Sequence, residues 1–292
     1  MQTFTQTKHM HQVTGFPLNL FLLLAFTGLL PVTIKCQVTT VKTADSLAIL
    51  KTFGEPFGDF EVDNLGNLYL FGARQQLKKL SPTYDSLAVF NDTRHFGKLF
   101  MLDASNPLRI LLFYRDFGAI IILDRFLNVR TILNLRTAGY QQVSAITQSY
   151  DNNIWLYDEL ENMIKKIDEG GKTLTSSPDF RVMFDEPPQP IALQDFNRYL
   201  YAYDPDKGLV VMDYFGAVKN KLSFKGWHNL HSAGNGIVAT DSTGLVYFQP
   251  GNPDTKNQPL PAWMLSAKKI RVHQDKLYVL DNEGRLGIYR LP

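Results

Sequence analysis

One short pattern recurs six times in this chain, and such a repeat restricts the fold more than any other feature of the sequence. Each copy is a brief apolar or aromatic run that ends in an acidic or turn-forming residue. The copies are residues 68–72, 112–116, 154–158, 200–204, 237–241 and 277–281. Successive copies end 37 to 46 residues apart, and a four-stranded propeller blade takes about 40 to 50 residues. The repeat therefore predicts an all-β protein, a six-bladed β-propeller that occupies residues 38–292.

Further strands are expected on both sides of each repeated core strand. Alternation of apolar and polar residues marks an inner strand before it and a third strand after it. Inner strands are expected at 59–62, 99–102, 143–147, 191–194 and 270–273, and third strands at 76–80, 119–123, 163–167, 209–212, 245–248 and 286–289. Asp and Gly follow several third strands, as in Asp168-Glu169-Gly170-Gly171. These residues favour tight hairpins, because Asp bonds its own backbone and Gly accepts a positive φ.

The ring is predicted to close with a strand from the start of the propeller. The sequence ends at Pro292, directly after the third strand of the sixth repeat, and leaves that blade without an outer strand of its own. Ser46–Phe53 is a strand candidate that precedes the first blade. Pairing it with Leu286–Tyr289 would complete the sixth sheet and leave no gap in the ring.

The first blade resembles a known repeat family. Phe53-Gly54-Glu55-Pro56-Phe57-Gly58-Asp59-Phe60-Glu61-Val62-Asp63-Asn64-Leu65-Gly66-Asn67-Leu68-Tyr69-Leu70 is similar to an NHL-type repeat. The similarity is good in this blade, partial in blades three, four and six, and weak in blades two and five. It implies a six-bladed propeller of the NHL and TolB-like type. It does not specify a function, because propellers of this kind serve as enzymes, receptors and scaffolds.

Residues 1–37 are interpreted as a signal peptide. A weakly basic start precedes an apolar run, Leu18 to Leu30, which has the length of a signal-peptide core and is short for a membrane span. Cleavage after Cys36 predicts an exported protein, periplasmic or associated with the outer membrane. Two alternatives stay open: lipidation of Cys36, which Lys35 disfavours, and a retained membrane anchor. The mature chain contains no other apolar stretch long enough to span a bilayer.

Charge and cysteine content limit the partners and the compartment. Lys8 and Lys35 are the only formally charged residues among the first 37, so the rest of the chain carries 28 basic and 28 acidic side chains. A neutral chain lacks the basic field that nucleic-acid binding requires. Cys36 is the single cysteine, so no intramolecular disulfide can form. An exported domain without disulfides suits a bacterial envelope better than an animal extracellular space.

The sequence offers no strong signal for catalysis, a metal or a cofactor. Acidic residues gather at the hairpin ends, where turn formation explains them better than a ring of metal ligands: Asp116, Asp158, Asp204, Asp241 and Asp281. Asp63 and Asp103, which close inner strands, are interpreted in the same way. His228 and His231 have no nearby carboxylate or thiol in the sequence and form a weak metal signal. Hydrolase and nucleotide motifs are missing, so no cofactor is predicted.

Aromatic residues and a histidine in the connections that enter the inner strands, together with a nearby arginine, are the candidate binding residues. Trp, Tyr and Arg are the residue types that anchor protein interfaces, and the set is Arg115, Tyr140, Trp227, His228 and Trp263. The alternative is that the aromatic rings fill the space between neighbouring blades. We therefore predict a non-catalytic exported scaffold that binds a protein or an envelope polymer. The competing hypothesis is a metal-dependent propeller hydrolase or lactonase with its site in the central channel.

Overall fold

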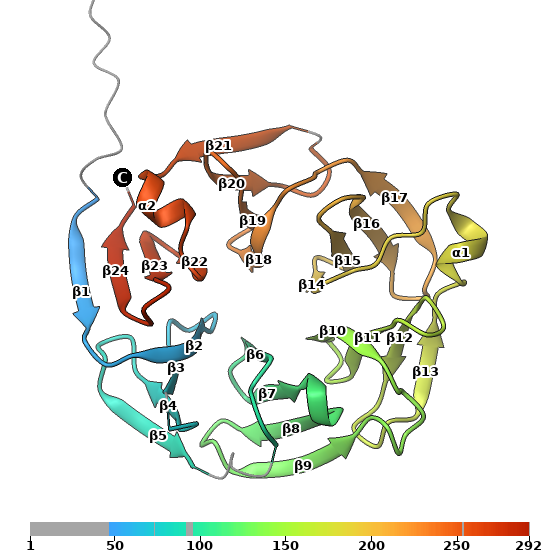
Figure 1. The fold of residues 1–292 in the computed structure, drawn as a ribbon, viewed down its shortest axis with the longest axis horizontal. Helices are drawn as coiled ribbons and strands as arrows, with labels where there is room; N and C mark the ends of the chain where they lie inside the picture. The colour runs from blue at the N-terminus through green and yellow to red at the C-terminus, as the bar shows by residue number, and fades with distance from the viewer. Residues whose placement is uncertain (1–46, 73, 92–95, 253, 292) are drawn as a thin grey trace, which may run out of the picture. The chain divides into compact units, whose positions relative to one another are not determined.

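The computed structural model describes residues 47–72, 74–91, 96–252 and 254–291. The predicted signal peptide and Cys36 lie outside these residues. The described residues form six four-stranded antiparallel sheets around a central axis (Figure 1). The six-bladed all-β propeller predicted from the repeat is confirmed. Among the described residues, no helix is long and apolar enough to cross a bilayer.

The strands of each blade follow one another from the channel to the rim. The inner strands are β2 (Phe57–Val62), β6 (Met101–Asn106), β10 (Val143–Gln148), β14 (Ala192–Phe196), β18 (His228–Ala233) and β22 (Lys269–His273). The second strands are β3 (Leu68–Gly72), β7 (Arg109–Tyr114), β11 (Ile154–Asp158), β15 (Tyr199–Asp204), β19 (Gly236–Thr240) and β23 (Lys276–Leu280). The third strands are β4 (Leu77–Leu80), β8 (Ala119–Asp124), β12 (Met163–Ile167), β16 (Gly208–Asp213), β20 (Gly244–Phe248) and β24 (Leu286–Arg290). The outer strands are β5 (Ser86–Phe90), β9 (Val129–Asn134), β13 (Thr173–Ser176), β17 (Val218–Leu222), β21 (Thr255–Pro259) and β1 (Ile49–Phe53).

Within the part of the chain that the structure describes, three short helical turns connect strands. They are η1 (Arg115–Phe117), α1 (Phe180–Met183) and α2 (Ala262–Leu265). Asp179 begins α1, where its carboxylate accepts a hydrogen bond from the backbone N–H of Arg181. This bond satisfies one of the amide groups that a helix start leaves unpaired.

The strand predicted to close the ring does so. In the sixth sheet β1 lies outside β24 and pairs with it antiparallel, so that Ile49 faces Tyr289 and Phe53 faces Leu286. Figure 1 shows this N-terminal strand on the rim of the blade that contains the end of the chain. One sheet thus joins the two ends of the described chain, and no gap separates the first blade from the last.

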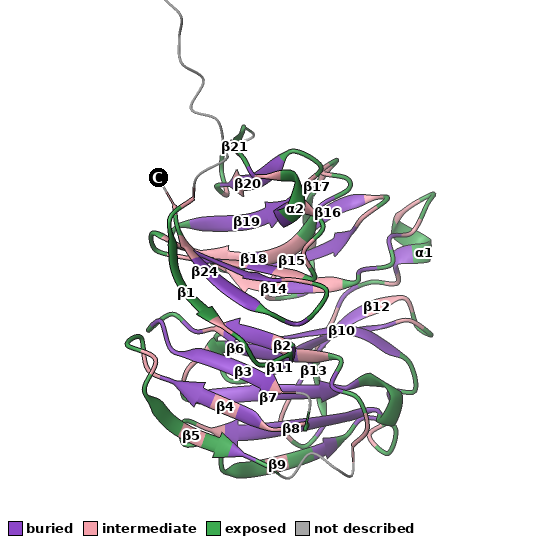
Figure 2. Cartoon of the chain, turned by 60° about the vertical axis from the view of Figure 1, so that its left-hand side comes forward, coloured by how far each residue is buried: buried purple, intermediate pink, exposed green. Residues whose placement is uncertain are grey.

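The hydrophobic core lies between the blades. Six apolar clusters are present among the described residues, and each is built by two neighbouring blades. All six residues of β7 are buried, and so are all five of β11. Figure 2 shows the second strands as buried and the outer strands β1, β5 and β9 as largely exposed. A blade therefore buries both faces only when both of its neighbours are in place.

Three segments differ from the prediction. An inner strand of blade five, His228–Ala233, was not expected. Its sequence is polar, and a register shift between His228 and His231 interrupts the alternation on which the prediction relied. The inner strand of blade two runs from Met101 to Asn106 and not over 99–102. The core strand of that blade ends at Tyr114, because η1 follows directly.

Candidate functional site

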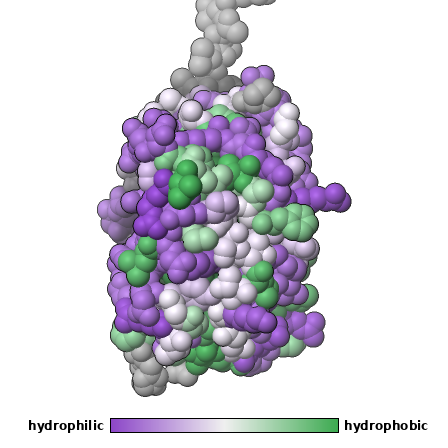
Figure 3. Space-filling view, turned by 90° about the vertical axis from the view of Figure 1, so that its right-hand side faces the viewer, coloured by the Kyte–Doolittle hydropathy of each residue, from purple (hydrophilic) through white to green (hydrophobic). Residues whose placement is uncertain are grey.

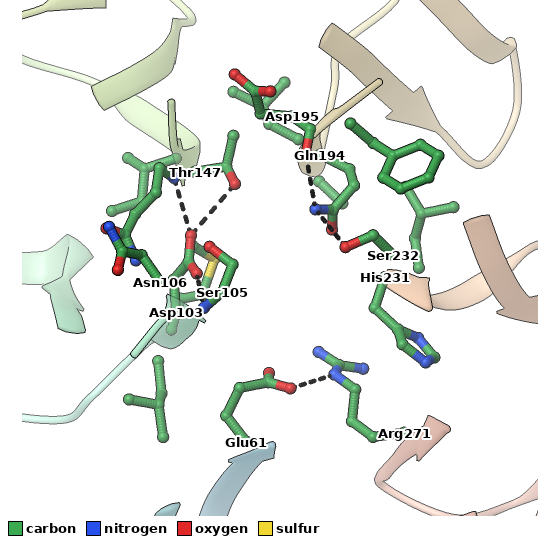
Figure 4. A pocket seen from close by; sticks show the side chains of 18 of the residues that line it. Glu61, Asp103, Ser105, Asn106, Thr147, Gln194, Asp195, His231, Ser232 and Arg271 are labelled. Atoms are coloured by element: carbon green, nitrogen blue, oxygen red, sulfur yellow. Dashed lines mark hydrogen bonds and ion pairs between the residues drawn. The ribbon is translucent and has the colours of Figure 1, made fainter. Parts of the chain in front are cut away.

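The inner strands of all six blades surround one large cavity, the central channel. It encloses about 1630 Å³ and is lined by residues from β2, β6, β10, β14, β18 and β22. Figure 4 shows polar side chains from every side of this channel. Since each inner strand contributes only a few side chains, the chemistry of the channel depends on how the blades combine them.

A group of ion pairs joins blades six and one across the wall of the channel. The Nε of Arg271 lies 2.8 Å from Oε1 of Glu61, and the Nζ of Lys269 lies 3.1 Å from Oε2 of the same carboxylate. Lys269 also contacts Asp59 at 2.8 Å. Burial alone would raise the pKa of Glu61, but the charges of Arg271 and Lys269 outweigh it and lower that pKa to about 2. Glu61 is therefore an ionised structural partner, and its basicity is too low for a general base.

His231 completes this wall from blade five. Its Nδ1 lies 2.7 Å from the carbonyl oxygen of Asn229, and its Nε2 accepts a hydrogen bond from the backbone N–H of Val272 at 2.9 Å. Since Nε2 accepts, Nδ1 carries the proton and donates to Asn229. Burial and the Arg271 charge lower the pKa of His231 to about 3. Both ring nitrogens are already engaged, so His231 has no free nitrogen for a ligand or a metal.

Hydrogen bonds between blades continue around the channel. Oδ2 of Asp103 in blade two accepts hydrogen bonds from the hydroxyl of Thr147 at 3.2 Å and the backbone N–H of Gln148 at 2.9 Å, both in blade three. Nε2 of Gln194 in blade four donates to the hydroxyl of Ser232 in blade five at 3.2 Å. Figure 4 shows both contacts on the channel wall. These polar atoms hold neighbouring blades together.

Sequence reasoning missed this polar wall because it searched the loops. The missed residues share one property, a polar side chain on an inner strand of the structure, and they are Glu61, Asp103, Thr147, Gln194, His231 and Arg271. A search for polar residues at equivalent positions of the repeat would have found most of them. Asp103 was interpreted only as a turn residue. Its Oδ1 does accept the N–H of Ser105, but its second oxygen bridges two blades.

Of the five acidic residues predicted to form the hairpin turns, four do so, and the fifth, Asp116, lies in η1. Asp158, Asp204, Asp241 and Asp281 each accept backbone N–H bonds from residues two to four positions later. The carboxylate of Asp63 accepts two backbone bonds, one from Asn67, and the hydroxyl of Tyr69 as well. Among the described residues, no group of three His, Cys, Asp or Glu side chains lies close enough to hold a metal ion.

The five candidate binding residues do not gather at one site. Arg115 is the one that lines the channel, and its guanidinium carbon lies 3.9 Å from the ring centre of Phe100. His228 is exposed at the start of β18. Trp263 in α2 is 52% exposed, and its ring centre lies 5.6 Å from that of Tyr289. Whether these three residues contact a partner stays a prediction.

Tyr140 and Trp227 lie between blades, where the alternative interpretation placed such rings. Trp227 is 5% exposed and stacks on Phe224, with ring centres 4.5 Å apart and planes 16° apart. The hydroxyl of Tyr140 lies 3.0 Å from the carbonyl oxygen of Gly171 and 2.7 Å from the hydroxyl of Thr173. Both rings pack in hydrophobic clusters formed by neighbouring blades. In this structure neither ring is available to a partner.

The role of Tyr140 as a connector between blades can be tested by removing its hydroxyl alone. We expect Tyr140→Phe to lower the free energy of unfolding by about 1–2 kcal/mol, because the acceptor on Gly171 and the hydroxyl of Thr173 lose their partner while the ring stays packed. Urea unfolding of the two proteins measures the difference. Tyr199→Phe, which changes a partly exposed tyrosine, is the control and should stay within about 0.5 kcal/mol of the parent. Equal stability of all three proteins would contradict the structural role.

Comparison with known proteins supports the fold and no specific activity. No family model matches the sequence, and no curated protein matches it. Among solved structures, the chain is similar to a streptogramin B lyase, with 15% identity, a TM-score of 0.55 and coverage of 80% of this chain and 78% of the lyase. It is also similar to a catalytically inactive histidine-to-alanine variant of virginiamycin B lyase from Staphylococcus aureus with quinupristin, with 12% identity, a TM-score of 0.56 and coverage of 85% and 99%.

A third similar structure is PorZ, a bacterial surface component of the type-IX secretion system of Porphyromonas gingivalis. The identity is 13% and the TM-score is 0.54; the match covers 81% of this chain and 31% of PorZ. At these identities the similarity concerns the fold alone. It does not single out the NHL family, which stays an expectation from the sequence. The chain is thus a six-bladed β-propeller that resembles the propellers of virginiamycin B lyase and PorZ.

Proposed function

We propose that this protein is an exported, non-catalytic β-propeller that binds a protein or polymer ligand in its central channel and serves as a scaffold in a bacterial cell envelope. The observation that carries the proposal is the size of the channel together with the bonding of its titratable side chains. The channel is large enough for a ligand, but the two groups best suited to acid–base chemistry, Glu61 and His231, are already bonded to neighbouring residues. Glu61 is paired with Arg271 and Lys269, and His231 uses both nitrogens.

Catalysis would require a different arrangement of these groups. A general base needs a free lone pair and a pKa near the working pH. The charges of Arg271 and Lys269 overcome the effect of burial and lower the pKa of Glu61 to about 2, whereas burial and the Arg271 charge lower that of His231 to about 3. The similar structures are consistent with either use of the fold, since they include a lyase and a surface component of a secretion system. A fold of this kind does not decide function, so the proposal rests on the channel.

The side of the propeller drawn in Figure 3 offers less support for a binding site than the channel does. On the side shown in Figure 3, hydrophobic side chains lie in small groups separated by hydrophilic ones. Single exposed apolar residues are normal on a protein surface, and an interface is marked by a larger continuous patch.

The export part of the proposal rests on the apolar run Leu18 to Leu30. Sequencing the N-terminus of the protein recovered from an envelope fraction tests that part directly.

Blocking the channel tests the binding function. Ser232 lies on the channel wall, so Ser232→Trp places a large side chain in the cavity, whereas Ser86→Trp places the same side chain on the exposed strand β5. Each protein is immobilised and exposed to a detergent extract of the native envelope, and the retained material is identified by mass spectrometry. We expect the parent and Ser86→Trp to retain the same ligand, and Ser232→Trp to retain at least tenfold less.

Two results would contradict the proposal. One is equal retention by the folded Ser232→Trp protein, which would place binding outside the channel. The other is a chemical change in the extract that the parent causes and Ser232→Trp does not, which would show a channel-dependent enzyme. Circular dichroism and thermal unfolding establish that both tryptophan variants are folded.

A further inference from the structure

Two tyrosines, one exposed and one half-buried, stack at the end of the channel where the inner strands finish. Tyr150 lies in the turn between β10 and β11, and Tyr214 lies in the turn between β16 and β17. Their ring centres are 4.5 Å apart, and their planes differ by 14°. Both residues line the channel, and Tyr150 is 68% exposed. Since Tyr214 covers one face of the Tyr150 ring, the large exposed area belongs mainly to the opposite face.

A half-buried carboxylate fixes this stack in place. Asp195 in β14 accepts hydrogen bonds from the hydroxyl of Tyr214 at 2.5 Å, from Nε1 of Trp155 at 3.2 Å and from the backbone N–H of Tyr150 at 3.4 Å. Burial raises the pKa of Asp195, and burial together with the Asp195 carboxylate raises the pKa of the Tyr214 hydroxyl. The hydroxyl therefore stays protonated and continues to donate. One residue thus holds rings from blades three and four.

A lysine reinforces the stack from within the protein. The Nζ of Lys166 lies 5.0 Å from the ring centre of Tyr150, 5.1 Å from that of Trp155 and 5.4 Å from that of Tyr214. The same ammonium group forms an ion pair with Asp151. Cation–π contacts of this kind stabilise the ring orientation. A surface that is fixed before binding loses little conformational entropy when a ligand arrives.

Hydrogen-bonding groups lie at the same end of the channel. Oε1 of Gln148, two residues before Tyr150, accepts a hydrogen bond from Nη1 of Arg109 at 3.2 Å. Its Nε2 has no partner among the described residues, although the side chain is 4% exposed and lines the channel. A buried donor without a partner is costly. A hydrogen bond from Nε2 to an acceptor on a ligand would therefore be favourable. Asn106 and Asn197 also line this end.

The charge of the channel favours an uncharged ligand. Among the described lining residues, seven carboxylates are offset by six Lys and Arg side chains. Several of these charges are already paired, as in the group of Glu61, Lys269 and Arg271. A channel whose positive and negative charges balance attracts neither a polyanion nor a polycation strongly. A second exposed ring, Phe215, follows Tyr214, lines the same channel and is 87% exposed, which extends the apolar contact beyond one ring.

We infer that this channel mouth is a binding subsite for a neutral carbohydrate, with Tyr150 as the platform for one sugar ring. A pyranose presents C–H groups on one face, which suit the negative face of an aromatic ring, and hydroxyl groups at its edge, which suit amide partners such as Gln148. This inference deepens the proposed function and rests on it, because it names neutral envelope glycans as the ligand class of the channel.

Calorimetric titration with defined oligosaccharides tests the subsite. The probes are the hexasaccharides of β-1,4-linked N-acetylglucosamine, β-1,4-linked glucose, β-1,3-linked glucose and α-1,4-linked glucose. We expect at least one of them to bind the parent protein with a Kd below about 1 mM. Tyr150→Ala should weaken that binding at least tenfold, whereas Tyr150→Phe, which keeps the ring face, should stay within about threefold. Tyr199→Ala, a partly exposed tyrosine outside the channel lining, should leave binding unchanged.

The possible outcomes separate this inference from the function on which it rests. If no hexasaccharide binds, or if Tyr150→Ala binds as tightly as the parent, the carbohydrate subsite is overturned. The channel function still stands in that case if Ser232→Trp abolishes retention of an envelope protein. Binding of a hexasaccharide that Ser232→Trp and Tyr150→Ala both weaken supports both proposals. If Tyr150→Ala is unfolded by circular dichroism, Tyr150→Lys, which removes the ring and keeps a long side chain, must show the same tenfold loss.

Discussion

Removal of residues 47–53 is expected to lower the free energy of unfolding by about 5 kcal/mol or more. These residues contain β1, whose pairing with β24 is what joins the first blade to the last. Each main-chain hydrogen bond lost from this ladder contributes about 1 kcal/mol. The ring of Phe53, which packs against Phe57 and Tyr84, adds about 2 kcal/mol of lost burial. For a domain of this size the loss corresponds to a melting temperature lower by about 10–20 °C.

The truncation also exposes the edge of β24, and an unpaired edge strand is a template for association between chains. We therefore expect the truncated protein to elute as dimers or larger species in size-exclusion chromatography, with thermal unfolding as the second measurement. Ile49→Ser is the matched control, because it changes a residue of β1 that is 65% exposed and keeps the backbone pairing. A truncated protein that is monomeric and as heat-stable as the parent would refute the closure role of β1.

Acid is expected to destabilise the protein strongly through two residues of the channel wall. Burial and the Arg271 charge lower the pKa of His231 to about 3 from an ordinary value of 6.5. The native state therefore keeps this imidazole neutral at pH values where the unfolded chain protonates it. By linkage, stability falls as the pH drops from about 6.5 towards 3. The full shift corresponds to about 5 kcal/mol.

Glu61 adds to this effect at lower pH. Its folded pKa is lowered to about 2, against an ordinary value of 4.5, by Arg271 and Lys269 despite the opposing effect of burial. Its contribution to stability is present above pH 4.5 and is lost as the pH falls towards 2. Together the two residues predict a loss of about 4 kcal/mol between pH 7 and pH 4, most of it from His231. The charged groups that face His231 are Arg271, Lys269 and Glu61.

Urea unfolding at pH 7, 5.5 and 4 measures this loss. His231→Gln removes the titrating ring and keeps an acceptor for the N–H of Val272, so most of the pH dependence between 6.5 and 4.5 should disappear. His228→Gln changes an exposed histidine at the start of the same strand and should keep the parent's pH dependence. If His231→Gln is destabilised by acid to the same extent as the parent, the assignment of the acid sensitivity to His231 is wrong.

The sequence by itself determined the blades. A second strand such as Ile154–Asp158 is buried on both faces, so its sequence is a nearly continuous apolar run, and such runs are visible without a structure. The hairpins were equally visible, because Asp158 and Asp204 bond backbone groups only two or three residues away. The closing strand could be predicted because one blade lacked an outer strand and the start of the propeller supplied one. All three features are local, or follow from counting repeats.

Only the tertiary structure decided what the channel contains. Glu61 and Arg271 are 210 residues apart in the sequence and meet because the ring closes. Tyr150 and Tyr214 stack because turns of two different blades end side by side, and nothing near either residue in the sequence indicates the other. The same is true of Trp227, which resembles an exposed anchor in the sequence and packs on Phe224 between blades. Pairing within a blade depends on neighbours in the chain, whereas contacts around the channel and between blades depend on closure of the whole ring.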